Sequence, residues 1–235
     1  MMETEGRMTT TTQPRITFDG NAYRLDGQPL PRVSDILAVI NKPGLNAWRA
    51  RVGNEEADRI SQAAAGLGTR IHAACESLAR ELLVDGVGLR ADAIAEELQP
   101  YLDVYERFLA EQVVEVLSVE QRVYHEAHRY AGTIDLLARL RDGRVCVLDI
   151  KTGKTVDGTT HPLQLAAYAT ALESMGQPVD GRYVLHLPAN KPGTLVRYDF
   201  SDGEKYDPCW RAAVRLHRHY EATKDHWRTL KGEVL

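Results

Sequence analysis

The sequence has few cysteines, no long apolar run and no internal repeat, and these absences narrow the class of protein. Cys75, Cys146 and Cys209 are isolated from one another. They fit neither a disulfide framework nor a four-cysteine zinc or iron–sulfur site, and they are typical of a reducing cytoplasm. No apolar stretch approaches the length that crosses a bilayer, so we expect no membrane association. The N-terminus carries Glu3 and Glu5 and no apolar segment, which argues against a secretory signal.

An excess of positive charge is also lacking. Lys plus Arg total 29 and Asp plus Glu total 33, giving a net charge of −4, so any nucleic-acid-binding surface must be local. Acidic residues that hold a metal ion also lower the net charge, and the balance therefore does not exclude a nuclease. Hydrophobic residues make up 43% and charged residues 26% of the 235 positions, which is typical of a globular protein with a sizeable core.

No linker is long enough to demand a second folded unit. We expect a disordered tail over residues 1–14, with Met8 as an alternative start, followed by one domain over residues 15–235. Its helical N-terminal part covers about residues 33–112 and its C-terminal helix about residues 208–230. The predicted order is helices, three strands, a helix, two strands and a helix. This order indicates an α/β fold with a central mixed sheet flanked by helices.

A small hairpin is predicted ahead of the helical part. Its strands cover residues 16–18 and 23–25, and Pro29-Leu-Pro31 ends it. Ser34 and Thr69 are the predicted N-caps of two helices. The predicted helices of this part cover residues 35–40, 45–52, 54–65, 70–83 and 91–112, the last of them bent at Pro100.

The chemistry is expected in a hairpin of residues 132–140 and 144–151, joined at Asp142-Gly143. It places Asp135 and Asp149 near the ends of neighbouring strands, and Lys151 on the same side as Asp149 because side chains alternate along a strand. Either aspartate alone is better explained by a hydrogen-bonded turn than by a metal ligand. Carboxylates beside a lysine in so apolar a segment suit metal-dependent phosphodiester hydrolysis. The preceding strand, residues 113–123, contains Glu120.

Four motifs of the chain, taken together, resemble the PD-(D/E)XK nuclease superfamily, specifically its RecB-like branch. That branch includes helicase–nuclease domains, CRISPR-adaptation nucleases and phage or mitochondrial single-chain exonucleases. Residues 31–37 and 48–53 also resemble the lead-in of the phage and mitochondrial members, so the resemblance covers roughly residues 29–187 and implies a restriction-endonuclease-like core. The motifs, in the family's order, are Gly68-Thr-Arg-Ile-His72, Gly132-Thr-Ile-Asp135, Asp149-Ile-Lys151-Thr-Gly-Lys154 and Gln164-Leu-Ala-Ala-Tyr168.

The resemblance implies a role for each matching residue. Lys151 would position the attacking water and stabilise charge, which we favour over a strict base role because a base would need a depressed pKa. Gln164 and Tyr168 would orient the metal site and the DNA strand, and Glu120 would support them. Glu76, four residues after His72, is only a candidate. The implied ligands of Mg²⁺ or Mn²⁺ are His72, Asp135, Asp149 and the Ile150 carbonyl, and the imidazole favours Mn²⁺.

Candidate contacts to the substrate lie on the C-terminal helix and in two loops. The C-terminal helix carries Arg211, Arg215 and Arg218 at helical spacing, interleaved with Trp210, Tyr220 and Trp227. Aromatic side chains of this kind stack on the bases of single strands. The alternative is a solvated amphipathic helix whose aromatic side chains lie in the core. Lys154 and Lys191 are further candidate phosphate contacts from loops.

The expected function is that of a metal-dependent DNA nuclease. We expect an exonuclease acting on DNA ends or single strands in recombination, repair or phage replication, located in the cytoplasm of a bacterial or phage-infected cell. A recombination protein is the expected kind of protein partner, and the oligomeric state stays open. The alternatives are an endonuclease of the same superfamily and a catalytically silent nucleic-acid-binding member. The presence of Asp135, Asp149 and Lys151 argues against a catalytically silent protein.

Overall fold

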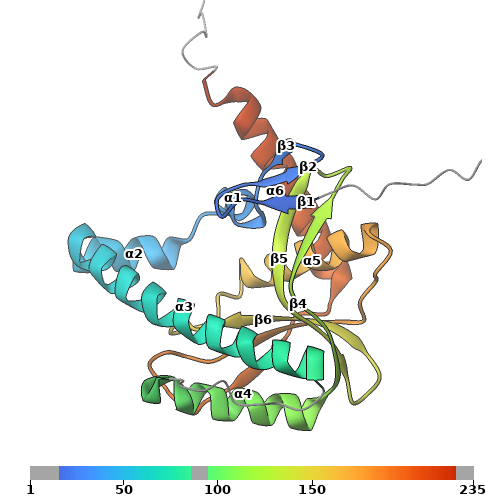
Figure 1. Cartoon of the computed structure of the whole chain (residues 1–235). Coiled ribbons are helices and arrows are strands. Elements are labelled where there is room, and N and C mark those ends of the chain that lie inside the picture. The colour runs from blue at the N-terminus through green and yellow to red at the C-terminus, as the bar shows by residue number, and fades with distance from the viewer. Residues whose placement is uncertain (1–15, 86–94, 226–235) are drawn as a thin grey trace, which may run out of the picture.

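The computed structural model describes residues 16–85 and 95–225 (Figure 1). Several expectations lie outside these residues: the tail over residues 1–14, most of the loop after residue 84, the start of the predicted helix at 91–112, and the end of the C-terminal helix with Trp227.

A five-stranded mixed sheet forms the centre of the fold, which confirms the predicted α/β class. The strand order is β4-β5-β6-β7-β8. β6 and β7 pair in parallel and every other neighbouring pair is antiparallel. Helix α5 (His161–Ser174) connects the two parallel strands. The strands are β4 (Val113–His125), β5 (Tyr130–Leu140), β6 (Val145–Lys151), β7 (Gly181–His186) and β8 (Val196–Asp199).

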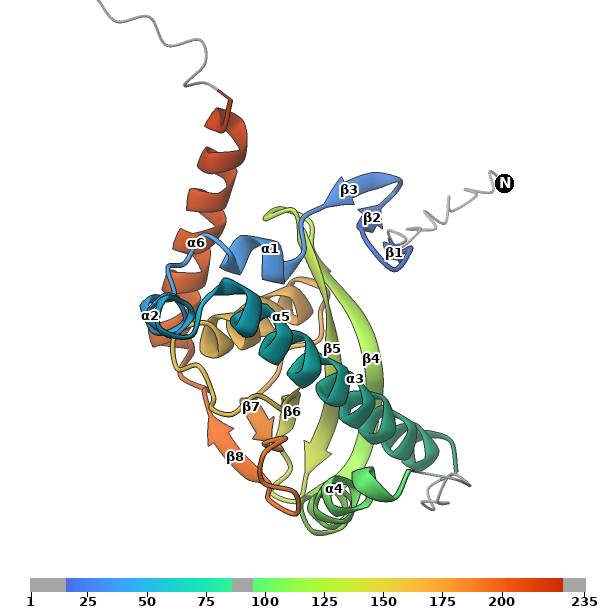
Figure 2. The same ribbon diagram turned by 90° about the vertical axis from the view of Figure 1, so that its left-hand side faces the viewer.

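Helices cover both faces of this sheet. Figure 1 shows α3 (Asn54–Asp85) and α4 (Gln99–Gln112) together on one side, where Ile71, Tyr105 and Leu148 belong to one buried cluster. On the other side α5 and α6 (Gly203–Thr223) pack over a second cluster that includes Leu165 and Trp210. Two separate clusters arise because successive side chains of a strand point to opposite faces. Figure 2 shows the second half of α6 rising past α1 (Val33–Leu37), away from the sheet.

The N-terminal segment forms a three-stranded antiparallel sheet rather than a two-stranded hairpin. The predicted strands are present as β1 (Ile16–Phe18) and β2 (Tyr23–Leu25), and β3 (Gln28–Leu30) pairs with β2. Pro29 was expected to end the hairpin. It lies instead in β3, which is an edge strand and therefore tolerates a residue without an N–H. The Tyr23 hydroxyl lies 2.7 Å from Oγ1 of Thr133, which ties this small sheet to β5.

Two predicted N-caps were wrong. α3 is one continuous helix through Gly66 and Gly68, and Oγ1 of Thr69 donates to the Ala65 carbonyl at 2.9 Å, as a hydroxyl inside a helix does. Ser34 lies within α1, whose N-cap is Arg32. The backbone N–H of Arg32 donates to the Asp35 carboxylate at 3.0 Å, so the reciprocal half of a capping box holds this helix start.

Three more helices differ from prediction only at their ends. α2 (Pro43–Val52) begins two residues earlier than expected. Pro100 lies in the first turn of α4, where its missing N–H costs no helical bond, so it begins the helix rather than bending it. α6 begins at Gly203, because the Asp202 carboxylate accepts a hydrogen bond from the Lys205 N–H at 3.0 Å. No helix in the described part of the chain combines the length and apolarity needed to cross a membrane.

Candidate active site

Strands β5 and β6 part where the candidate catalytic residues lie. Their register pairs Leu136 with Leu148, and one further step would set Asp135 opposite Asp149. The backbone N–H of Ile150 donates there to Oδ2 of Asp135 at 2.6 Å, so a side chain takes the place of the strand partner. Two carboxylates thus meet at the point where the ladder ends. Asp149 lies near the end of β6 as predicted, whereas Asp135 lies in the middle of β5.

Lys151 lies beside the second of these carboxylates. Its Nζ atom is 2.5 Å from Oδ2 of Asp149, and the two side chains share one side of β6, as the alternation predicts. Asp149 is 2% exposed. Its Oδ2 atom makes no hydrogen bond of normal geometry within the described structure, so the lysine ammonium is its one charged contact there. A charged group taken out of water is costly unless it is paired, so this contact stabilises the buried side chain.

Helix α3 brings His72 to the same place. Nδ1 of His72 lies 3.6 Å from Oδ2 of Asp135. The helix approaches the loop after β6 so closely that a Cβ atom on Gly68 would lie 2.6 Å from Oγ1 of Thr152. Only glycine fits this contact without displacement, which explains why a glycine stands one helical turn before the histidine.

Glu120 of β4 also faces this group of acids. The pairs Val119–Leu136 and Gln121–Ile134 place it opposite Asp135 in the strand register. Its φ of +51° is unusual for a residue with a side chain. Burial, together with the nearby charges of Asp135 and Glu76, raises the pKa of Glu120 to about 7.

Gln164 and Tyr168 lie on one face of α5, as their spacing predicts. Nε2 of Gln164 donates to the Tyr168 hydroxyl at 2.7 Å. The ring of Tyr168 is buried against Gly132, on which a Cβ atom would lie 2.7 Å from Cε1 of the ring. Burial, followed by the negative charge of Asp149, raises the pKa of Tyr168 well above its ordinary value. The tyrosine is therefore a neutral hydrogen-bonding group.

The site holds more negative charge than its own cations balance. Burial and the charge of Asp149 raise the pKa of Asp135, against the opposing effects of His72, Lys151 and the Ile150 N–H. Carboxylates and an imidazole are suitable donors for a hard divalent cation, so the donor set fits such an ion. Within the described residues, no three His, Cys, Asp or Glu side chains stand ready to hold an ion. Asp149 contacts Lys151 instead.

A hollow of about 700 Å³ opens beside Lys151 and Gln164. Its walls come mainly from α1, α2 and the segment between them, together with the start of α5. Lys42 and His161 line it, and both were missed by the sequence reasoning. Lys42 stands next to Pro43 and gave only a helix-boundary signal, and nothing in the local sequence marks His161.

The predicted nucleic-acid contacts fall in different places. Lys154 is exposed in the loop after β6, three residues beyond Lys151. The arginines of α6 are exposed and none of them lines the hollow beside Lys151. Arg211 lines a separate pocket with His125 and His128 of the β4–β5 hairpin, and Nη2 of Arg218 donates to the Ala127 carbonyl at 3.3 Å.

Of the aromatic side chains on α6, Trp210 belongs to the core. It is fully buried, and its ring centroid lies 5.0 Å from that of Tyr130 in an edge-on arrangement. The alternative reading, aromatic side chains in the core, is therefore right for Trp210. Tyr220 is 58% exposed.

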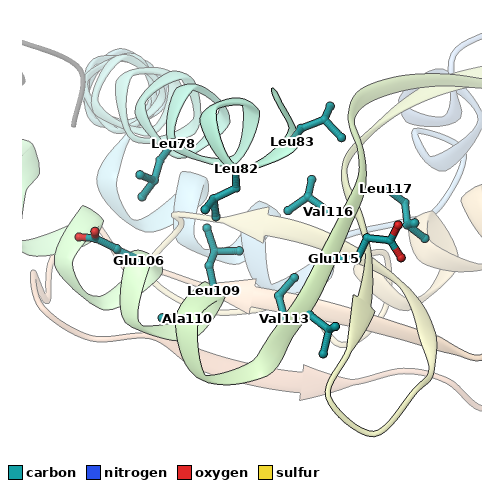
Figure 3. Close-up of a pocket in the computed structure, with 11 residues that line it drawn as sticks. Leu78, Leu82, Leu83, Glu106, Leu109, Ala110, Val113, Glu115, Val116 and Leu117 are labelled. Atoms are coloured by element: carbon teal, nitrogen blue, oxygen red, sulfur yellow. The ribbon is translucent and has the colours of Figure 1, made fainter. Parts of the chain in front are cut away.

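An apolar groove of about 680 Å³ lies elsewhere, between α3, α4 and the beginning of β4 (Figure 3). Figure 3 shows leucines of both helices and valines of β4 around it, including Leu82, Leu109 and Val116. None of the predicted site residues lines this groove. It is therefore separate from the candidate active site.

Comparisons with known proteins bear on the family of the chain. Mitochondrial genome maintenance exonuclease 1 of Mus musculus is 30% identical over 137 residues, which are 53% of this chain and 38% of the relative, so the chain spans well under two thirds of it. The crystal structure of SSO0001 aligns with 86% of this chain and 76% of its own, at 14% identity and a TM-score of 0.37. The family model of the PD-(D/E)XK nuclease superfamily matches residues 46–234. Because this match covers most of the chain, the protein belongs to the PD-(D/E)XK nuclease superfamily, as its motifs predict.

Proposed function

We propose that this nuclease is a divalent-metal-dependent deoxyribonuclease that degrades DNA from its ends. The proposal is based on one observation. Asp135 and Asp149 lie next to each other where the pairing of β5 and β6 ends, and Nζ of Lys151 lies 2.5 Å from Oδ2 of Asp149. Nucleases of this superfamily generally use divalent metals such as Mg²⁺. The excess of buried negative charge at this point is what such an ion would balance.

The residues proposed to hold the ion come from three elements. They are His72 of α3, Asp135 of β5, and Asp149 with the Ile150 carbonyl of β6. An imidazole among the ligands favours Mn²⁺ over Mg²⁺. When bound, the ion would act as a Lewis acid toward the phosphodiester and lower the pKa of water.

The other side chains have separate proposed tasks. Lys151 is partly exposed toward the hollow, so its ammonium can contact a phosphate oxygen and stabilise the negative charge that develops during hydrolysis. Gln164 is held by Tyr168 at the edge of the same hollow, which suits it to orient the strand. Glu120 would tune the charge of the acidic group through Asp135. Lys154 would contact a phosphate from the loop after β6.

Two observations favour an exonuclease over an endonuclease. The hollow beside Lys151 is bounded by α1, α2 and the start of α5, and its volume of about 700 Å³ has room for the end of a strand. A relative of part of this chain is named an exonuclease. A closed circle of DNA offers no end to place in such a hollow, so substrate topology separates the two activities.

The test incubates the purified protein with linear and circular DNA, each single- and double-stranded, in Mn²⁺, Mg²⁺ or EDTA. We expect degradation of linear DNA only, with a divalent cation, and 5′-phosphorylated products. Cleavage of intact circles would contradict the proposal and show that the protein is an endonuclease. DNA binding without cleavage under any condition would favour the catalytically silent alternative.

A further inference from the structure

A second cationic feature lies at the tip of the β4–β5 hairpin, apart from the acids of the candidate active site. A pocket of about 210 Å³ is bounded there by the hairpin, the second half of α5 and α6. The ring centroids of His125 and His128 are 4.3 Å apart, and the backbone N–H of His128 donates to Nδ1 of His125 at 3.2 Å. The lining residues are His125, His128, Thr170, Glu173, Ser174 and Arg211.

Two arginine side chains lie at this pocket, Arg211 in its lining and Arg218 beside it. The side chain of Arg211 makes no hydrogen bond or ion pair with any residue that the structure describes, although it lines the pocket. Arg218, seven residues further along the same face of α6, donates to the Ala127 carbonyl through Nη2 alone. Glu173 is the one acidic side chain among the lining residues described, so the two guanidinium groups of Arg211 in the lining and Arg218 beside it face one carboxylate.

We propose that Arg211, Arg218 and the two histidines form a second binding site, for a backbone phosphate of the DNA strand whose end is cut beside Lys151. This inference rests on the proposed function. Guanidinium groups hold phosphate oxygens through paired N–H donors, and exposed, unpaired arginines keep those donors available. The contact positions the strand and reads no base.

The state of the histidines agrees with an anionic ligand. Burial, together with the charges of His128 and Arg218, lowers the pKa of His125 to about 4. Burial, Arg218 and Arg211 lower the pKa of His128. Both rings are therefore neutral near pH 7, and each keeps one N–H donor. A phosphate in the pocket could accept hydrogen bonds from these N–H groups and from the guanidinium of Arg211.

Helix α5 links the two sites and gives their separation. Gln164 lines the hollow beside Lys151, whereas Thr170 and Ser174 line the second pocket. They lie six and ten residues further along the helix, about 9 and 15 Å at a rise of about 1.5 Å per residue. A stacked strand advances about 3.4 Å per nucleotide, so the two sites are spaced by roughly three to four nucleotides along a strand that follows the helix.

The test measures binding of fluorescein-labelled single-stranded dT20 in EDTA, where it is not cut, at several salt concentrations. Each phosphate contact contributes about 0.7 to the slope of log affinity against log salt for a single strand, so Arg211→Ala with Arg218→Ala, which removes this one contact, should lower that slope by about 0.7. Arg107→Ala, an exposed arginine of α4, is the matched control and should leave the slope unchanged.

Cleavage measurements separate this inference from the proposed function. The double variant should still cut dinucleotides and trinucleotides like the wild type, but lose the gain in rate that longer strands give. A wild-type slope in the double variant, or an equal loss in Arg107→Ala, would overturn the second site while cleavage stands. Competition by polyglutamate at the same charge concentration would assign the pocket to an acidic protein instead. A wild type that neither binds nor cuts DNA would overturn both proposals.

Discussion

The ring of Tyr168 rests directly on the backbone of Gly132, so closely that a Cβ atom there would lie 2.7 Å from Cε1 of the ring and 3.2 Å from Cγ2 of Val33. This contact joins α5 to the strand that carries Asp135. It explains why a glycine begins the Gly132-Thr-Ile-Asp135 motif, because any side chain would push away the tyrosine that holds Gln164.

Gly132→Ala should therefore both destabilise the protein and reduce cleavage. Overpacking of this kind costs about 1–3 kcal/mol. Denaturant unfolding measures the first effect, and the rate on linear DNA at a temperature where the variant is folded measures the second. Tyr168→Phe is the informative companion, since it keeps the ring and removes only the hydroxyl that accepts from Gln164. Full activity in Gly132→Ala would show that the position of Tyr168 is unimportant.

Two glycines of α3 should respond in opposite directions to the same substitution. Gly66 is exposed with open space around it, and alanine there should stabilise the protein by up to about 1 kcal/mol through helix propensity. Gly68→Ala would place its methyl group against Thr152 and should destabilise instead. Thermal unfolding of both variants checks the sign. Equal effects would mean that α3 and the loop after β6 do not make this contact.

Asp149→Asn and Lys151→Ala should each abolish most cleavage while leaving the fold intact. The loss for Lys151→Ala is expected at roughly 10²- to 10⁴-fold, the range for a group that acts on the reacting atoms. Circular dichroism checks the fold, and single-turnover assays on linear DNA measure the rate. Metal-dependent cleavage at the wild-type rate in both variants would remove these residues from the site.

Glu120→Gln should raise stability at alkaline pH and lower activity. The pKa of this carboxyl is about 7 in the folded protein, above its ordinary value of 4.5, so the folded state loses stability as the pH rises from about 4.5 through 7. Glutamine removes that loss, worth at most about 3 kcal/mol at pH 8. Urea unfolding in EDTA at pH 5 and pH 8 tests it, and the difference in stability between the variant and the wild type should be much larger at pH 8.

Acid should destabilise the protein through His161. Burial and the charge of Lys151 lower the pKa of this imidazole to about 4, so the stability that its neutral form contributes is lost as the pH falls from about 6.5 to about 4. Nδ1 of His161 accepts from the Asp157 N–H at 3.1 Å, and His161→Asn keeps an acceptor there. The variant should lose less stability over this range, by at most about 3 kcal/mol. Exposed His219→Asn is the control.

The sequence was sufficient to predict the central sheet because its signals are local. Alternating apolar residues and the Asp142-Gly143 turn predict the β5–β6 hairpin, and helical spacing predicts that Gln164 and Tyr168 share a face. The break expected near Gly66 and Gly68 failed because a long-range contact with Thr152 decides that position. Local propensity could not show that the second glycine serves packing.

In the candidate site, too, local sequence signals and long-range packing decide different features. Motif order predicts which side chains belong to it, and His72, Asp135, Asp149 and Lys151 do lie together. The positive φ of Glu120 is a backbone feature that no sequence motif indicates. Helical spacing groups the arginines of α6, but only the packing of that helix shows that Arg211 and Arg218 face the β4–β5 hairpin.

The parting of β5 and β6 also makes the Ile150 amide a reporter of the site. Its proton is held by the Asp135 carboxylate rather than by a strand partner, so its exchange with solvent deuterium depends on the charge of that one side chain. In the neighbouring ladder pairs, exchange depends on opening of the sheet. Amide exchange at this residue therefore follows events at the acids directly, without any substrate being turned over.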